Sequence, residues 1–146
     1  MKWIFVLLAL AAGATMPVQA GLNLRLKQAL GDPVFAALVS FAVGTAALAV
    51  YAFTMRPVPT MAMASSAPWW AWTGGFCGAF FVAVIIVLAA QLGATTTMAW
   101  LLAGQFLVAL LLDHFGLISF DVHTLSWPRI LGVVLVVIGA MLVNKY

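Results

Sequence analysis

The sequence predicts an all-α polytopic membrane protein with five transmembrane helices. Of its 146 residues, 66% are hydrophobic and only 6% are charged, and the mean hydropathy is +1.21. Soluble domains carry about 25% charged residues, so composition excludes one. The few charges are separated by long apolar stretches, and 57–112 contains none. Each helix that crosses a bilayer needs about 20 mostly apolar residues, and the chain supplies four such stretches and a shorter fifth, 130–144, within a single domain, 1–146.

The first helix is expected at about 3–20, either ending there or continuing as an interfacial turn to Gly31, and its local pattern is also that of a cleavable signal. Lys2 precedes an apolar run that ends in small residues before Gly21. The rest of the chain is equally apolar, so we expect this segment to be retained as a transmembrane helix. Pro17 lacks an N–H and clashes with the carbonyl of Gly13, which predicts a helix break or kink there.

Four further helices are expected at about 33–55, 70–90, 96–113 and 129–144. Asp32 and Pro33 form a helix-start signal after Gly31, and tryptophans 69, 70 and 72 are typical of a membrane interface. Small residues recur on single faces of three helices, which favours close helix packing. They are Ala36, Ser40 and Gly44; Gly74 and Gly78; and Gly132 and Gly139.

The positive charges do not select an orientation. With five spans, Lys2, Arg56 and Arg129 lie on one side of the membrane, and Arg25, Lys27 and Lys145 lie on the other. Orientation follows the excess of Lys and Arg, and the excess here is zero. This favours insertion in both orientations and an antiparallel homodimer, an architecture similar to the inverted repeats of transporters. The alternative is a single orientation fixed by Lys2 or by folding.

Six motifs stand in the order and spacing of a known family. They are PVQAGLNLRL (17–26), LVSFAVGT (38–45), PWWAWTGG (68–75), QLGA (91–94), AGQFL (103–107) and LLLDHFG (110–116). Through them almost the whole chain resembles the short, five-helix YdcZ-type bacterial inner-membrane proteins of the drug/metabolite transporter superfamily.

The resemblance implies half of a ten-helix inverted-repeat fold in the bacterial inner membrane. The second half would be another copy of this chain in inverted orientation or a paralogue, and the cargo an unidentified metabolite or toxic compound. The small multidrug-resistance branch uses a glutamate in its first helix. No acidic residue precedes Asp32 here, so that mechanism does not carry over.

Polar side chains inside a membrane are costly and are candidate functional sites. Gln19 and Asn23 are four residues apart, on one helix face beside Pro17, and can either face a transport path or hydrogen-bond neighbouring helices. Gln105 lies about 13 Å from either end of its helix, where it can line the pathway or join two copies. Trp100 can line a path for an apolar or cationic substrate or pack in the core.

Asp113 and His114 end the fourth predicted helix. They are neighbours in sequence, so they do not face each other as an acid–base pair. Asp113 can take part in ion coupling or can mark the membrane interface and pair with Arg129.

Other classes of function find no support in the sequence. We expect no metal site, because the spacing of the histidines and aspartates fits no compact ligand set, and we expect no cofactor and no nucleic-acid partner. Enzymatic function is not expected, because no nucleophile–base pair or phosphate-binding loop occurs. A passive channel built from the same antiparallel dimer and a non-transporting membrane assembly subunit are the alternatives to a transporter working by alternating access.

The first helix gives a direct test. We expect the intact mass of the purified protein to include residues 1–20, because this segment belongs to the membrane domain. A mass lacking these residues would show that they form a signal peptide.

Overall fold

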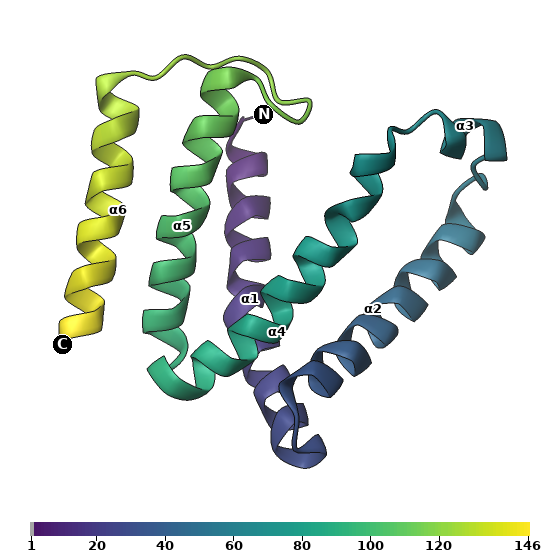
Figure 1. Cartoon of the computed structure of the whole chain (residues 1–146), viewed down its shortest axis with the longest axis horizontal. Coiled ribbons are helices and arrows are strands. Elements are labelled where there is room, and N and C mark those ends of the chain that lie inside the picture. The colour runs from purple at the N-terminus through teal and green to yellow at the C-terminus, as the bar shows by residue number, and fades with distance from the viewer. Residues whose placement is uncertain (1) are drawn as a thin grey trace. The chain divides into compact units, whose positions relative to one another are not determined.

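A computed structural model describes residues 2–146, with only the backbone of Lys2, and within this range it contains helices and no strands (Figure 1). Five helical segments are long and apolar enough to cross a membrane, which confirms the predicted fold class. The elements are α1 (Lys2–Leu30), α2 (Pro33–Met55), α3 (Met61–Ser65), the 3-10 helix η1 (Trp69–Thr73), α4 (Gly74–Leu92), α5 (Ala94–Phe115) and α6 (Trp127–Lys145).

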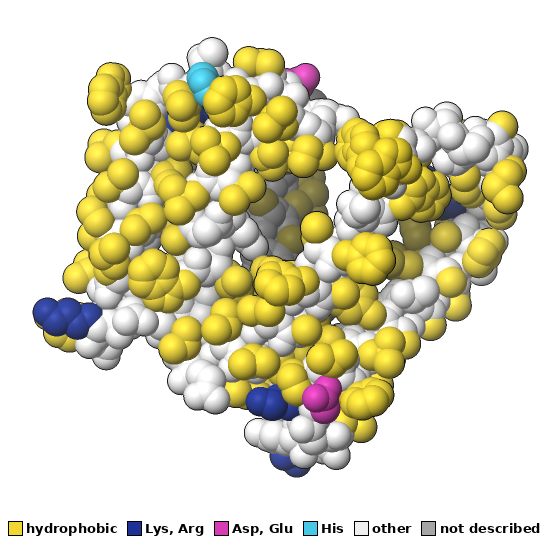
Figure 2. Space-filling model, in the orientation of Figure 1, with side chains coloured by type: hydrophobic (Ala, Val, Ile, Leu, Met, Phe, Trp, Pro, Cys, Tyr) yellow, Lys and Arg dark blue, Asp and Glu magenta, His cyan; other side chains and the backbone are white. Residues whose placement is uncertain are grey.

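The helices fall into two compact units, which divide after Gln91, and each is described separately. The prediction of one domain stays a prediction. Hydrophobic side chains cover much of the visible surface (Figure 2). In water such a surface would be a liability, but in a bilayer it is the surface that lipid or another apolar helix contacts.

In the first unit, a two-residue turn joins α1 to α2. The N–H of Gly31 donates to the Lys27 carbonyl at 2.8 Å, and its positive φ of 81° suits glycine at the end of a helix. Asp32 then caps α2, because its Oδ1 accepts from the N–H groups of Val34 at 2.7 Å and Phe35 at 3.0 Å. The Gly-Asp-Pro sequence therefore reverses the chain direction within a turn of two residues.

The helix α1 is longer than the membrane is thick. Its 29 residues span about 43 Å at 1.5 Å per residue, whereas the hydrocarbon core is about 30 Å. The helix extends beyond the expected 3–20 to Leu30, since the segment with Arg25 and Lys27 consists mainly of good helix formers. The charged end of α1 therefore reaches the headgroup region, and residues one or two turns earlier lie just inside the membrane.

Two short helical segments lie between α2 and α4, where the sequence suggested a loop and the start of a longer helix. Thr60 caps α3, with its side chain accepting from Met63 N–H at 3.4 Å. The tryptophan segment forms the 3-10 helix η1 directly before α4. The helix α3 is little more than one turn long and consists mainly of Met and Ala. Such a helix is too short to be predicted from hydrophobic periodicity.

Contact between α1 and α2 is made by small side chains. Ala20, Asn23, Ala36 and Ala37 are all buried, and the alanines allow the two backbones to approach closely near the turn. Farther from the turn, most residues of α1 and α2 are exposed. The two helices are therefore held together at one end.

The second unit is an antiparallel hairpin of α5 and α6 (Figure 1). Its most buried residues are Thr97, Ala103, Val133 and Ala140. The helix α5 ends at Gly116, which adopts the left-handed conformation with φ 59°. A Cβ atom at Gly116 would lie only 2.6 Å from Cγ2 of Val122, so this position requires glycine both for its backbone angle and for space.

The cap of α2 is open to a test. We expect Asp32→Ala to lower the free energy of unfolding by about 1 kcal/mol, because two N–H groups at the start of α2 lose their acceptor. Asp32→Ser should retain most of the stability. Unfolding in detergent, followed by circular dichroism, measures the change. The control is Asp121→Ala, which removes an exposed loop carboxylate; an equal loss in both variants would contradict the capping role.

Candidate functional site

A groove of about 430 Å³ runs between α1 and α2. We call it the α1–α2 groove. Its walls are mainly aliphatic, and four polar side chains interrupt them. The lining residues are Thr15, Val18, Gln19, Leu22, Asn23 and Leu26 of α1, with Val39, Ser40 and Val43 of α2. Its size and its few polar groups are typical of small-molecule sites.

Asn23 is the most unusual residue in the groove. Only 2% of its surface is exposed, and its Nδ2 atom has no hydrogen-bond partner among the residues that the structure describes. A buried amide nitrogen without a partner carries the full cost of its lost hydration, about 1–3 kcal/mol. A molecule that brought a hydrogen-bond acceptor to this amide would therefore remove that cost.

The other polar groups differ in how they are satisfied. The hydroxyl of Thr15 donates to the Ala12 carbonyl of its own helix at 2.7 Å, while Ser40 is half-buried and Gln19 is exposed. Gln19 and Ser40 also line a second hollow of about 150 Å³ that reaches Thr45 and Leu48. The amide of Gln19 is therefore free to turn toward either hollow.

The groove lies near one membrane surface. Asn23 and Gln19 precede Arg25 by two and six residues, or about 3 Å and 9 Å along the helix. With Arg25 at the headgroups, both amides lie in the outer third of the hydrocarbon. The α1–α2 groove is therefore close to water at one end.

The helix break predicted at Pro17 needs a correction. The structure keeps Gly13 and Pro17 within one continuous helix, α1, with no unwound segment. Pro17 still has no N–H to donate to the Gly13 carbonyl, but the helix on both sides of it satisfies the remaining backbone groups. The polar side chains, not an unwound backbone, therefore give the groove its chemistry.

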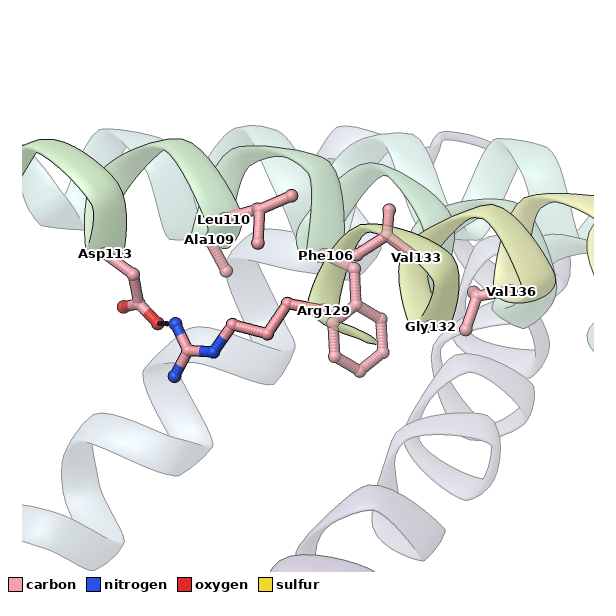
Figure 3. Close-up of a pocket in the computed structure, with 8 residues that line it drawn as sticks. All are labelled: Phe106, Ala109, Leu110, Asp113, Arg129, Gly132, Val133 and Val136. Carbon is pink, nitrogen blue, oxygen red and sulfur yellow. Dashed lines mark hydrogen bonds and ion pairs between the residues drawn. The ribbon is translucent and has the colours of Figure 1, made fainter. Parts of the chain in front are cut away.

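A second pocket, of about 390 Å³, lies between α5 and α6 (Figure 3). Arg129 and Asp113 lie at one end of it, with NH1 of the arginine 3.4 Å from Oδ2 of the aspartate. Their side chains are 39% and 34% exposed, so solvent weakens this ion pair. The remaining lining is almost entirely apolar, and comprises Phe106, Ala109, Leu110, Gly132, Val133 and Val136.

Three hydrogen bonds hold the loop between α5 and α6 over the end of α5, and an ion pair joins the two helix ends. The N–H of His123 donates to the Asp113 carbonyl at 2.8 Å, and the N–H of Leu125 donates to Nδ1 of His114 at 3.3 Å. Arg129 completes the set by donating to the His123 carbonyl at 3.4 Å as well as to Asp113. Asp113 and His114 therefore hydrogen-bond to the loop. Of the two roles predicted for Asp113, the structure shows the pairing with Arg129.

The two remaining pathway candidates lie on α5. Gln105 is exposed, and Trp100 is 38% exposed with its Nε1 donating to Oδ1 of Asn144 on α6 at 3.3 Å. Both belong to the second unit, whereas Gln19 and Asn23 belong to the first. Within the first unit, Gln19 and Asn23 line the same groove, and a pathway role for Gln105 and Trp100 stays a prediction.

The predicted packing residues differ in their surroundings. Ala36 is fully buried, Ser40, Gly78 and Gly139 are half-buried, and Gly44, Gly74 and Gly132 are exposed. A Cβ atom at Gly78 would lie 3.5 Å from the Phe41 ring, so the Phe41 side chain of α2 reaches α4 there. Ser40 was assigned to packing by its spacing, but it also lines the α1–α2 groove. Within the described residues no group of three metal-ligating side chains occurs.

The fold and composition define a class, the multi-pass α-helical membrane proteins. Comparison with known proteins places the chain within it. Residues 4–142 match the family described as "Putative inner membrane exporter, YdcZ" of the drug/metabolite transporters. The chain belongs to this YdcZ family, is a transporter-type protein, and is a multi-pass protein of the inner membrane.

A curated relative supports the same placement. The chain is 33% identical over 137 residues to the "Inner membrane protein YdcZ" of Escherichia coli (strain K12), which covers 93% of this chain and 91% of the relative. No solved structure matches the chain.

The loop contacts of Arg129 lead to a prediction. We expect Arg129→Gln to increase proteolytic cleavage within 117–126, because the His123 carbonyl of the loop loses its bond from Arg129 and α6 loses its ion pair with Asp113. Global stability should fall by less than about 1 kcal/mol, as expected for an exposed ion pair. Limited proteolysis in detergent measures the first effect and thermal unfolding the second. Lys145→Gln removes a cation from the other end of α6, and equal cleavage in that variant would contradict the loop contact.

Proposed function

We propose that this chain is one half of an exporter that moves a small molecule across the inner membrane by alternating access. The working unit is an antiparallel homodimer, in which two copies insert in opposite orientations. Its ten helices then form the inverted repeat that is common among secondary transporters. The family membership supports the transport class, and the charge balance of the chain supports the antiparallel dimer.

The charge balance carries the proposal for the dimer. Three basic residues lie on each side of the five-span topology. Orientation in the membrane is set by the difference in the number of Lys and Arg residues between the two sides. A chain with no difference populates both orientations. One chain in each orientation can then pair as an antiparallel dimer, which is the functional unit.

The groove favours a transporter over a channel. A channel needs a continuous polar lining, whereas the walls of the α1–α2 groove are mainly aliphatic with four separate polar groups. Such a lining suits binding of a discrete solute. Bound solute would then reach the opposite side when the two halves of the dimer exchange conformations.

Orientation provides the test. We expect Ser65→Lys with Ser66→Lys to place the α2–α4 connection in the cytoplasm of every cell, and Gln28→Lys with Gln91→Lys to impose the reverse orientation. Each double variant alone should lose transport, because it cannot form antiparallel pairs. Co-expression of the two should restore transport and should allow each tagged variant to co-purify the other.

The readout for orientation is a cysteine at position 146 in a Cys77→Ala background, which removes the chain's natural cysteine. A membrane-impermeant maleimide should label about half of the parent chains in intact cells, and nearly all or none of each double variant. Complete or absent labelling of the parent would refute dual topology. Solute flux that does not saturate and shows no exchange in proteoliposomes would instead indicate a channel.

A further inference from the structure

The α1–α2 groove also carries information about the chemistry of the solute, and this inference rests on the proposed transport function. The groove combines a buried, unpartnered amide with walls that carry no charge. Each of these two observations restricts the solute in a different way.

The amide of Asn23 specifies a hydrogen-bond acceptor. Its Nδ2 atom is buried without a partner, and burial of an unpaired donor is unfavourable. Leucine, which has the same number of side-chain heavy atoms, would occupy a similar space in a membrane helix without that cost. The polar side chain is therefore explained by a ligand that bonds to it, in keeping with the general role of polar residues inside membranes.

The lining of the groove specifies a neutral solute. None of its nine lining residues is ionisable. The nearest cation along α1, Arg25, is exposed and does not line the groove. An ionic solute entering this groove would lose its hydration without gaining a counter-charge, which is strongly unfavourable. An uncharged solute with apolar surface would instead gain contact with the aliphatic walls.

From these two restrictions we infer that the α1–α2 groove binds a neutral, partly apolar solute whose carbonyl, amide or hydroxyl oxygen accepts a hydrogen bond from Nδ2 of Asn23. The exposed amide of Gln19, one turn away on the same face, provides a second contact. Thr15 contributes little as a donor, because its hydroxyl already donates within α1.

Entry of the solute requires a change in the groove. Nδ2 of Asn23 is covered in the present conformation, so the amide must rotate or the two helices must separate before a solute can reach it. This is the behaviour expected of a site that alternates between closed and open states.

The test uses three solutes that each contain a phenyl ring and differ in charge: neutral benzamide, anionic benzoate and cationic benzylammonium. The full-length protein is placed in lipid nanodiscs, and binding of each radiolabelled solute is measured by equilibrium dialysis against protein-free nanodiscs. We expect saturable binding of benzamide, and binding of the two ions weaker by about tenfold or more, because the groove offers no counter-charge.

Asn23→Leu separates a role in binding from a role in folding. We expect benzamide binding to weaken by about fivefold or more through loss of one hydrogen bond, while Tm rises because a buried unpaired amide has been replaced by a side chain of similar size. Gln91→Ala removes an exposed amide outside the groove and should change neither quantity.

Several results would overturn the inference. Absence of saturable benzamide binding, stronger binding of either ion, or unchanged binding by Asn23→Leu would each exclude this solute class at the groove. A fall in Tm with loss of the dimer in Asn23→Leu would show that the amide bonds to the second copy. Failure of the paired orientation variants to complement would refute the antiparallel transporter, whatever the binding results.

Discussion

Inside a lipid bilayer, a backbone N–H or C=O group without a partner costs several kcal/mol, and no water is present to supply one. Every long segment of this chain meets that constraint by forming a continuous helix, including α1, which passes through Pro17 without unwinding. The hydroxyl side chains obey the same constraint locally. Those of Thr15 and Thr54 each donate to a carbonyl of their own helix at 2.7 Å, and that of Thr97 donates to the carbonyl of the N-cap residue Gly93 at the same distance. Against this background the unpartnered amide of Asn23 is conspicuous.

The same solvent explains how little the helices contact one another. Lipid is as apolar as leucine, so helices associate through close packing of small residues and not by hiding apolar surface. Contact between α1 and α2 accordingly rests on alanines near their turn, and larger side chains farther from it line the groove between the helices. The α1–α2 groove follows from this division. A contact built on larger side chains along the whole length would have left no such space.

Spacing and composition predicted most of the fold, because the bilayer leaves helices as the only form for long apolar stretches. The Gly-Asp-Pro turn was also predictable, since each residue has a specific role in ending or starting a helix. The extension of α1 to Leu30 was only an alternative to an end near residue 20, because Arg25 and Lys27 mark the end of the apolar stretch but do not end a helix. The site was predictable only in part. Spacing placed Gln19 and Asn23 on one face, but which amide is buried depends on the position of α2, and Ser40 shows the same dependence.

The turn at Gly31 and Asp32 has a mechanical consequence. Two residues join α1 and α2, and the two helices contact each other mainly beside this turn. The turn is therefore a hinge between them. Small rotations about the backbone of Gly31, which tolerates a wide range of angles, are amplified along the length of α1 into larger displacements at the far end. The capped start of α2 keeps that arm rigid up to the hinge. A change in the torsion angles of Gly31 would therefore change the width of the α1–α2 groove.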